Sequence, residues 1–205
     1  MSSAVAFHAG QLARNLLAGL RLALFLPVQA QAFRASAGQF ALLTLFNLAV
    51  WVAAAGERSG FAGDFQPSGL SVYLANVALV LATAFLVAHA YRMPERLLLV
   101  AVALSASDAL FDLTALAFVA AGATERHANA LYVAFVAWAW LASLRAAVVT
   151  CGWRRPGVFL AGLAVTLMTG LALLVIPDAD VWLEPDDEED RLEAHFPSKP
   201  HGQES

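Results

Sequence analysis

Charge and cysteine are both scarce in this sequence. Charged residues make up 14% of the 205 residues and hydrophobic residues 60%, whereas a typical soluble domain carries roughly 25% charged residues. The lone Cys151 cannot form an internal disulfide and has no second thiol for a metal site. So little charge beside so much apolar surface argues against an ordinary water-soluble domain.

The common enzyme motifs are absent as well. The sequence has no Gly-rich phosphate loop, no HExxH, no paired CxxC and no GxSxG. His89 has no second histidine at a matching depth that would complete a haem site, and no basic stripe accompanies the net charge of −4. We therefore expect a non-enzymatic protein that has no cofactor or metal and does not bind nucleic acid.

What the sequence does contain is long apolar blocks, each near the ~20 residues that a helix needs to cross a bilayer. Lipid cannot satisfy the hydrogen bonds of open strands or loops, so these blocks should be helical. The sequence predicts an all-α, polytopic transmembrane bundle of about five spans in residues 40–176. The predicted spans are Phe40 to Gly56, Ser71 to Tyr91, Leu97 to Gly122, Ala128 to Trp153, and Gly157 to Ile176.

Arginine placement predicts the orientation of these spans, because cytoplasmic flanks are enriched in Lys and Arg. The opposite loops hold only Arg58 and Arg126. We expect an integral protein of a bacterial inner membrane, with a cytoplasmic N-terminus and an external or periplasmic C-terminus. The arginines on the expected cytoplasmic side are Arg14, Arg21, Arg34, Arg92, Arg96, Arg154 and Arg155.

Residues 1–39 allow two interpretations. Leu22 to Val28 followed by Ala30-Gln31-Ala32 has the form of a cleavable signal peptide, but cleavage would reverse every loop. We favour a cytoplasmic segment with an interfacial amphipathic helix from Phe7 to Phe25, ended by Pro27. Its polar face would carry Gln11, Arg14, Ala18 and Arg21, with Leu12, Leu16, Leu20 and Leu24 lying elsewhere.

Two acids inside the third span are the strongest candidate site. Carboxylates are costly in a bilayer and usually mark a buried pair or a pathway. Asp108 and Asp112 share one helix face, which Ser105 continues. Arg145 in the fourth span lies within reach of Asp108 by depth, so a structural Asp108–Arg145 pair is expected. Asp112, without a matching cation, is expected to be protonated at rest, and proton or cation handling is the alternative role.

Polar residues in the second span and the C-terminal tail complete the predictions. Asn76 and Thr83 are seven residues apart, which favours an interhelical hydrogen-bonding seam. Beyond Pro177 the chain becomes acidic: nine of its sixteen acids fall between Asp178 and Glu193. Residues 177–205 are therefore expected to form a disordered tail.

The layout resembles the Yip family of five-span membrane proteins, in its bacterial form. The shared features are a cytoplasmic N-terminal stretch, a short entry with a proline (Leu24-Phe25-Leu26-Pro27, then Phe33-Arg34), and five closely spaced helices. The DLYGP-type motif of the eukaryotic branch is not present. The resemblance implies a scaffold or accessory subunit whose partners are lipids, other membrane proteins or further copies of itself. The competing hypothesis is a small transporter or channel component that uses Asp108 and Asp112.

Overall fold

Helices make up most of the structure. The computed structural model describes residues 2–58, 64–65, 68–120, 125–175 and 182–183, and each of the five predicted apolar blocks coincides with a helix in it. The all-α prediction is thus confirmed, apart from a two-residue strand pair. The helices are α1 (Ser2–Ala23), α2 (Ala37–Arg58), α3 (Ser68–Ala90), α4 (Leu97–Ala120), α5 (Glu125–Cys151) and α6 (Arg155–Val175), with 3-10 turns η1 (Ala30–Ala32) and η2 (Pro94–Arg96).

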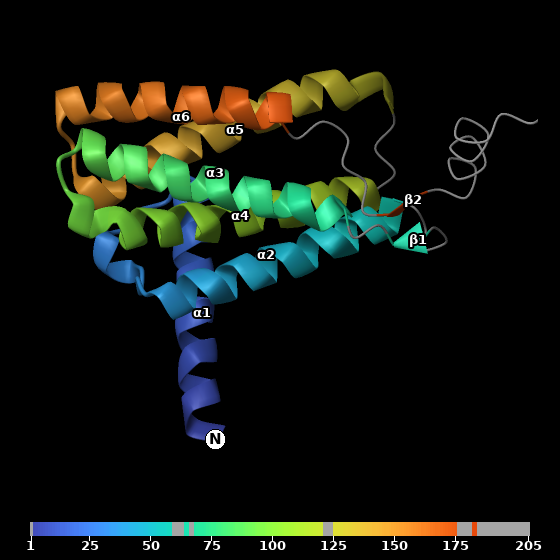
Figure 1. Cartoon of the computed structure of the whole chain (residues 1–205), viewed down its shortest axis with the longest axis horizontal. Helices are drawn as coiled ribbons and strands as arrows, with labels where there is room; N and C mark the ends of the chain where they lie inside the picture. Colours follow the sequence, from blue (N-terminus) through green and yellow to red (C-terminus); the bar gives the residue numbers. More distant parts are fainter. Residues whose placement is uncertain (1, 59–63, 66–67, 121–124, 176–181, 184–205) are drawn as a thin grey trace, which may run out of the picture.

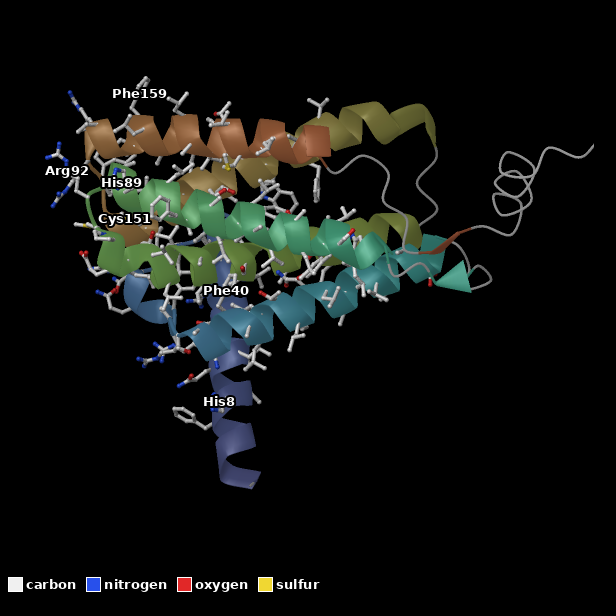
Figure 2. The ribbon with its side chains drawn as sticks, in the orientation of Figure 1. His8, Phe40, His89, Arg92, Cys151 and Phe159 are labelled. Carbon is white, nitrogen blue, oxygen red and sulfur yellow. The ribbon has the colours of Figure 1, made fainter. Side chains whose placement is uncertain are left out.

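Among the residues that the structure describes, four helices are long and apolar enough to cross a membrane. The qualifying segments are Ala37–Glu57, Gly69–Ala90, Pro94–Thr114 and Val133–Cys151, and Arg155–Leu171 in α6 is a shorter apolar stretch. Apolar side chains such as Phe159, Leu163 and Leu167 point outward from α6, as Figure 2 shows for Phe159. Such exposure is costly in water and favourable against lipid, so the chain is an integral membrane protein.

Helix α4 lies at the centre of the bundle. It packs against α1, α2, α3 and α5, while α6 covers α3 and α5. In Figure 1, α2 to α6 run nearly parallel or antiparallel to one another. More than half of the α4 span is buried (56%), against 22% in each of the other three candidate spans. Ser105 and Ser107 of α4 are therefore buried in the bundle, and Asp108 and Asp112 are partly buried.

Helix α1 runs across the bundle rather than along it (Figure 1). Its C-terminal half packs on α4, and Asn15, Ala18 and Leu22 are buried there. The contact is closest at Gly19, where an added Cβ would overlap the backbone carbonyl of Ala106. The interfacial position of this helix stays a prediction, but its C-terminal half also joins the core, because small residues let α1 approach α4 closely. His8 marks the half that projects away (Figure 2).

A buried polar cluster fixes the corner between α1 and α2. The Asn15 side chain donates to the Gln39 side chain (3.2 Å) and accepts from the backbone N–H of Arg34 (2.7 Å). Ser36 caps α2 by accepting from the N–H of Gln39 at 3.1 Å, the first half of a capping box. Asn15 and Gln39 are fully buried, so this corner is a rigid part of the fold.

Most of the expected tail lies outside the described residues. The described part of it, β2 (Trp182–Leu183), pairs antiparallel with β1 (Asp64–Phe65). This contact was not predicted from the acidic composition. The predicted disorder of the other tail residues stays a prediction.

Candidate functional site

The two acids of α4 line an enclosed pocket between α2, α3 and α4. The pocket has a volume of about 20 Å³, which is room for about one water molecule or a small ion. Oxygen-bearing side chains supply most of its wall, so the chemistry of the pocket suits a proton, a water or a hard cation. The wall consists of Thr44, Asn47, Tyr73, Asn76, Val77, Val80, Ser105, Asp108 and Asp112.

Asn47 gives this pocket an acceptor without a partner. The residue is 5% exposed, and its amide nitrogen donates to the backbone carbonyl of Ser105 at 2.9 Å. Its Oδ1 atom is buried and accepts no hydrogen bond. An orphaned buried oxygen costs ~1–3 kcal/mol unless a ligand or water meets it, and this one belongs to a residue that lines the pocket beside both acids.

Tyr73 closes the pocket on the α3 side. Its hydroxyl donates to the backbone carbonyl of Thr44 in α2 at 2.6 Å, and its ring lies 5.7 Å from the Trp51 ring. The phenol oxygen is therefore held in place by α2. Residues of three helices line one small space.

A second, wider space also reaches the same two acids. A groove of about 300 Å³ lies between α3, α4, α5 and α6. It shares Asn76, Val80, Asp108 and Asp112 with the enclosed pocket. The two acids thus lie where a small pocket and a wider groove meet, which is the arrangement of a binding site with an entry path.

The expected Asp108–Arg145 pair does not form. The Arg145 guanidinium turns to the C-terminus of α1, where Nη1 donates to the carbonyls of Leu22 (2.9 Å) and Arg21 (3.4 Å) and Nη2 to that of Leu26. The prediction failed because α1 was not expected inside the bundle. Within the described part of the chain, Asp108 and Asp112 have no basic partner.

Arg145 instead completes the cap of α1. The last turn of a helix leaves carbonyls without intrahelical donors. A cation at that end also interacts favourably with the helix dipole. Phe25, at a positive φ of 58°, ends α1 in a Schellman arrangement with Leu26 N–H on Arg21 O at 2.8 Å. The Arg145 guanidinium lies 5.4 Å from the Phe25 ring centre, and Trp138 Nε1 donates to Ala23 O at 2.8 Å.

We expect Arg145→Gln to loosen the docking of α1. The substitution removes the donors to three carbonyls and the cation beside Phe25, at a cost of about 1–3 kcal/mol. Thermal unfolding in detergent should show this loss, together with faster tryptic cleavage after Arg14. Arg154→Gln removes the same charge from an exposed loop and should change neither quantity. Equal unfolding temperatures and equal tryptic cleavage rates in the two variants would contradict the capping role of Arg145.

The predicted seam on α3 is only partly right. Asn76 and Thr83 do share a face, and both line the groove. However, the Thr83 hydroxyl donates to Leu79 O of its own helix at 2.7 Å, so it forms no interhelical bond. Ser143 likewise donates to Ala139 O in α5 (2.9 Å). These hydroxyls are therefore satisfied within their own helices, and they line the groove without closing it.

Sequence reasoning missed three polar residues of the pocket, Thr44, Asn47 and Tyr73. Asn47 is a single amide in a long apolar block, and nothing in the sequence singles out Thr44 or Tyr73. A lone amide inside a span is the one signal that could have pointed to the pocket, since it must find a partner there.

Among the described residues, no group of three or more His, Cys, Asp or Glu side chains is placed to hold a metal. His89, stacked on Phe85, and Cys151 lie at one end of the bundle (Figure 2).

The comparisons with known proteins identify no relative. No family model matches the sequence, and no match is found among curated proteins or solved structures.

Proposed function

We propose that this chain is a small ion-handling membrane protein of the transporter or channel type, in which Asp108 and Asp112 bind a proton or a small cation. The observation that carries the proposal is the pocket itself. Two carboxyl groups without a basic partner among the described residues line a space for one small ion. Asn47, whose buried Oδ1 accepts no hydrogen bond, lines the same space. Hard cations prefer oxygen ligands such as carboxylates and side-chain amide oxygens, and the wall of this pocket carries both beside Val77 and Val80.

The groove supports a route to the site. It reaches Asp108 and Asp112 from between α3 and α5, and its polar wall residues include Asn76, Thr83 and Ser143. A carboxyl that only fixed the register of two helices would need a partner and no open space. Here the partner is missing and the space is present, which favours ion handling over a structural role.

The proposal includes α6 as a fifth span. As a helix of 21 residues it is ~31 Å long at 1.5 Å per residue, and it packs against α3 and α5. With five spans, the arginine-rich loops lie on the cytoplasmic side of a bacterial inner membrane, and the acidic C-terminus lies outside.

Flux measurements on the purified full chain in proteoliposomes test this function. Wild-type protein should raise the uptake of ²²Na⁺ or the dissipation of a pH gradient, and Asp112→Asn should lower that rate at least tenfold, because the variant keeps the shape of the side chain without its ionisable group. Asp64→Asn, outside the four candidate spans, is the matched control and should behave as wild type.

The competing proposal is the scaffold role implied by the Yip-like layout. It predicts no protein-dependent flux of either ion, and an Asp112→Asn variant that keeps its function and fold. Flux that is absent from the wild-type protein, or unchanged in Asp112→Asn, would reject the ion-handling proposal in favour of the scaffold.

A further inference from the structure

A further, positively charged cavity lies where α1 meets α5. It has a volume of about 630 Å³ and lies between α1, the loop that follows it and α5. Arg14, Arg21 and Arg145 line it, and no acidic residue does. The remaining lining residues are Leu17, Ala18, Pro27, Val28, Gln29, Gln31 and Ala32.

The charge of this cavity is not neutralised by the protein around it. The first 56 residues contain no Asp or Glu. Arg14 donates to the backbone carbonyls of Ala32 (3.1 Å) and Gln31 (3.3 Å), and Arg145 to those at the end of α1. Carbonyl partners orient a guanidinium without cancelling its charge. The Arg21 side chain forms no hydrogen bond to any described residue.

The position of the cavity suits a lipid headgroup. Its loop residues Gln29 to Ala32 come a few residues before the first candidate span, which begins at Ala37. The end of a membrane span is the depth at which the headgroup region of the bilayer begins. Leu17 and Val28 add apolar wall beside the three cations, which matches the change from phosphate to acyl chain along a phospholipid.

We infer that this cavity binds the phosphate of an anionic phospholipid such as phosphatidylglycerol. Arg14 and Arg145 are held in place by their carbonyl contacts, and Arg21 supplies a guanidinium free to pair with phosphate oxygens. Basic pockets between membrane helices commonly bind anionic headgroups in this way. The site is separate from Asp108 and Asp112 and does not depend on the proposed ion handling.

Titration of the detergent-solubilised full chain with phosphatidylglycerol, followed by native mass spectrometry, tests this site. Arg21→Gln should weaken the binding of the first lipid about fivefold, since one such cation contributes ~1 kcal/mol. Arg34→Gln, an equal charge change outside the lining, should alter it less than twofold. Arg21 is chosen because its side chain has no part in capping α1, so the variant keeps its fold.

Two further titrations identify the source of the phosphate. Phosphatidylcholine should bind at least fivefold more weakly than phosphatidylglycerol, and inorganic phosphate at the same concentration should not displace the lipid. Equal weakening by Arg21→Gln and Arg34→Gln would overturn the site in favour of general surface charge. Displacement by inorganic phosphate would overturn its assignment to a lipid.

Discussion

Gly19→Ala should unfold the protein at a markedly lower temperature than wild type. The added Cβ would overlap the backbone carbonyl of Ala106 and lie 2.7 Å from its Cβ. Neither backbone can move away without separating α1 from α4, so we expect a loss of about 3 kcal/mol, the upper part of the range for overpacked cores. The buried Cys151 is the only cysteine in the sequence, so labelling by a thiol-reactive dye during heating reports the unfolding.

The same helix supplies an identical substitution with the opposite expected sign. Gly10 has no atom within 4 Å of an added Cβ and lies in the exposed part of α1. Gly10→Ala should therefore stabilise the protein by about 0.5–1 kcal/mol, because alanine loses less conformational freedom in a helix than glycine. Similar unfolding temperatures for the two variants would show that α1 does not pack on α4 as described.

The spans could be predicted from the sequence because one physical constraint sets them. Hydrocarbon thickness fixes the length of an apolar helix, so α2 to α6 coincide with the five apolar blocks to within a few residues at each end. Asp108 and Asp112 could be found for a related reason, since an ionisable group in a span is a rare and costly choice. Both inferences need only local sequence.

The pocket could not be predicted, because it depends on how three helices are rotated against one another. Asn47 reaches the pocket only when α2 and α4 are rotated so that its amide nitrogen donates to the Ser105 carbonyl oxygen. Arg145 was paired with the wrong partner for a similar reason: depth along the helices allowed Asp108, but the carbonyls of α1 come closer. Small residues such as Gly19 signal that helices can approach, but they do not say which helices do.

Sodium should reverse the stability order of wild type and Asp108→Asn. In choline chloride no sodium is present to offset the cost of burying two acids beside the Asn47 oxygen. Replacing one acid by a neutral amide of the same shape should therefore stabilise the fold. In sodium chloride the wild type gains binding energy that the variant lacks. At a hundred times the dissociation constant that gain is ~2.7 kcal/mol, or roughly 5–10 °C in the unfolding temperature for a chain of this size.

Two more variants assign this effect to the pocket. Asn47→Ala removes the neutral oxygen and keeps both acids. The sodium concentration that gives half of the stabilisation should therefore rise about tenfold, while sodium still stabilises the variant. Ser107→Ala lies on the same buried turn of α4, but the Ser107 hydroxyl bonds to Ala103 O and Leu104 O of its own helix and lines neither space. Its sodium response should equal that of wild type. A sodium shift that persists at full size in Asp108→Asn would place the ion outside the pocket that Asp108 and Asp112 line.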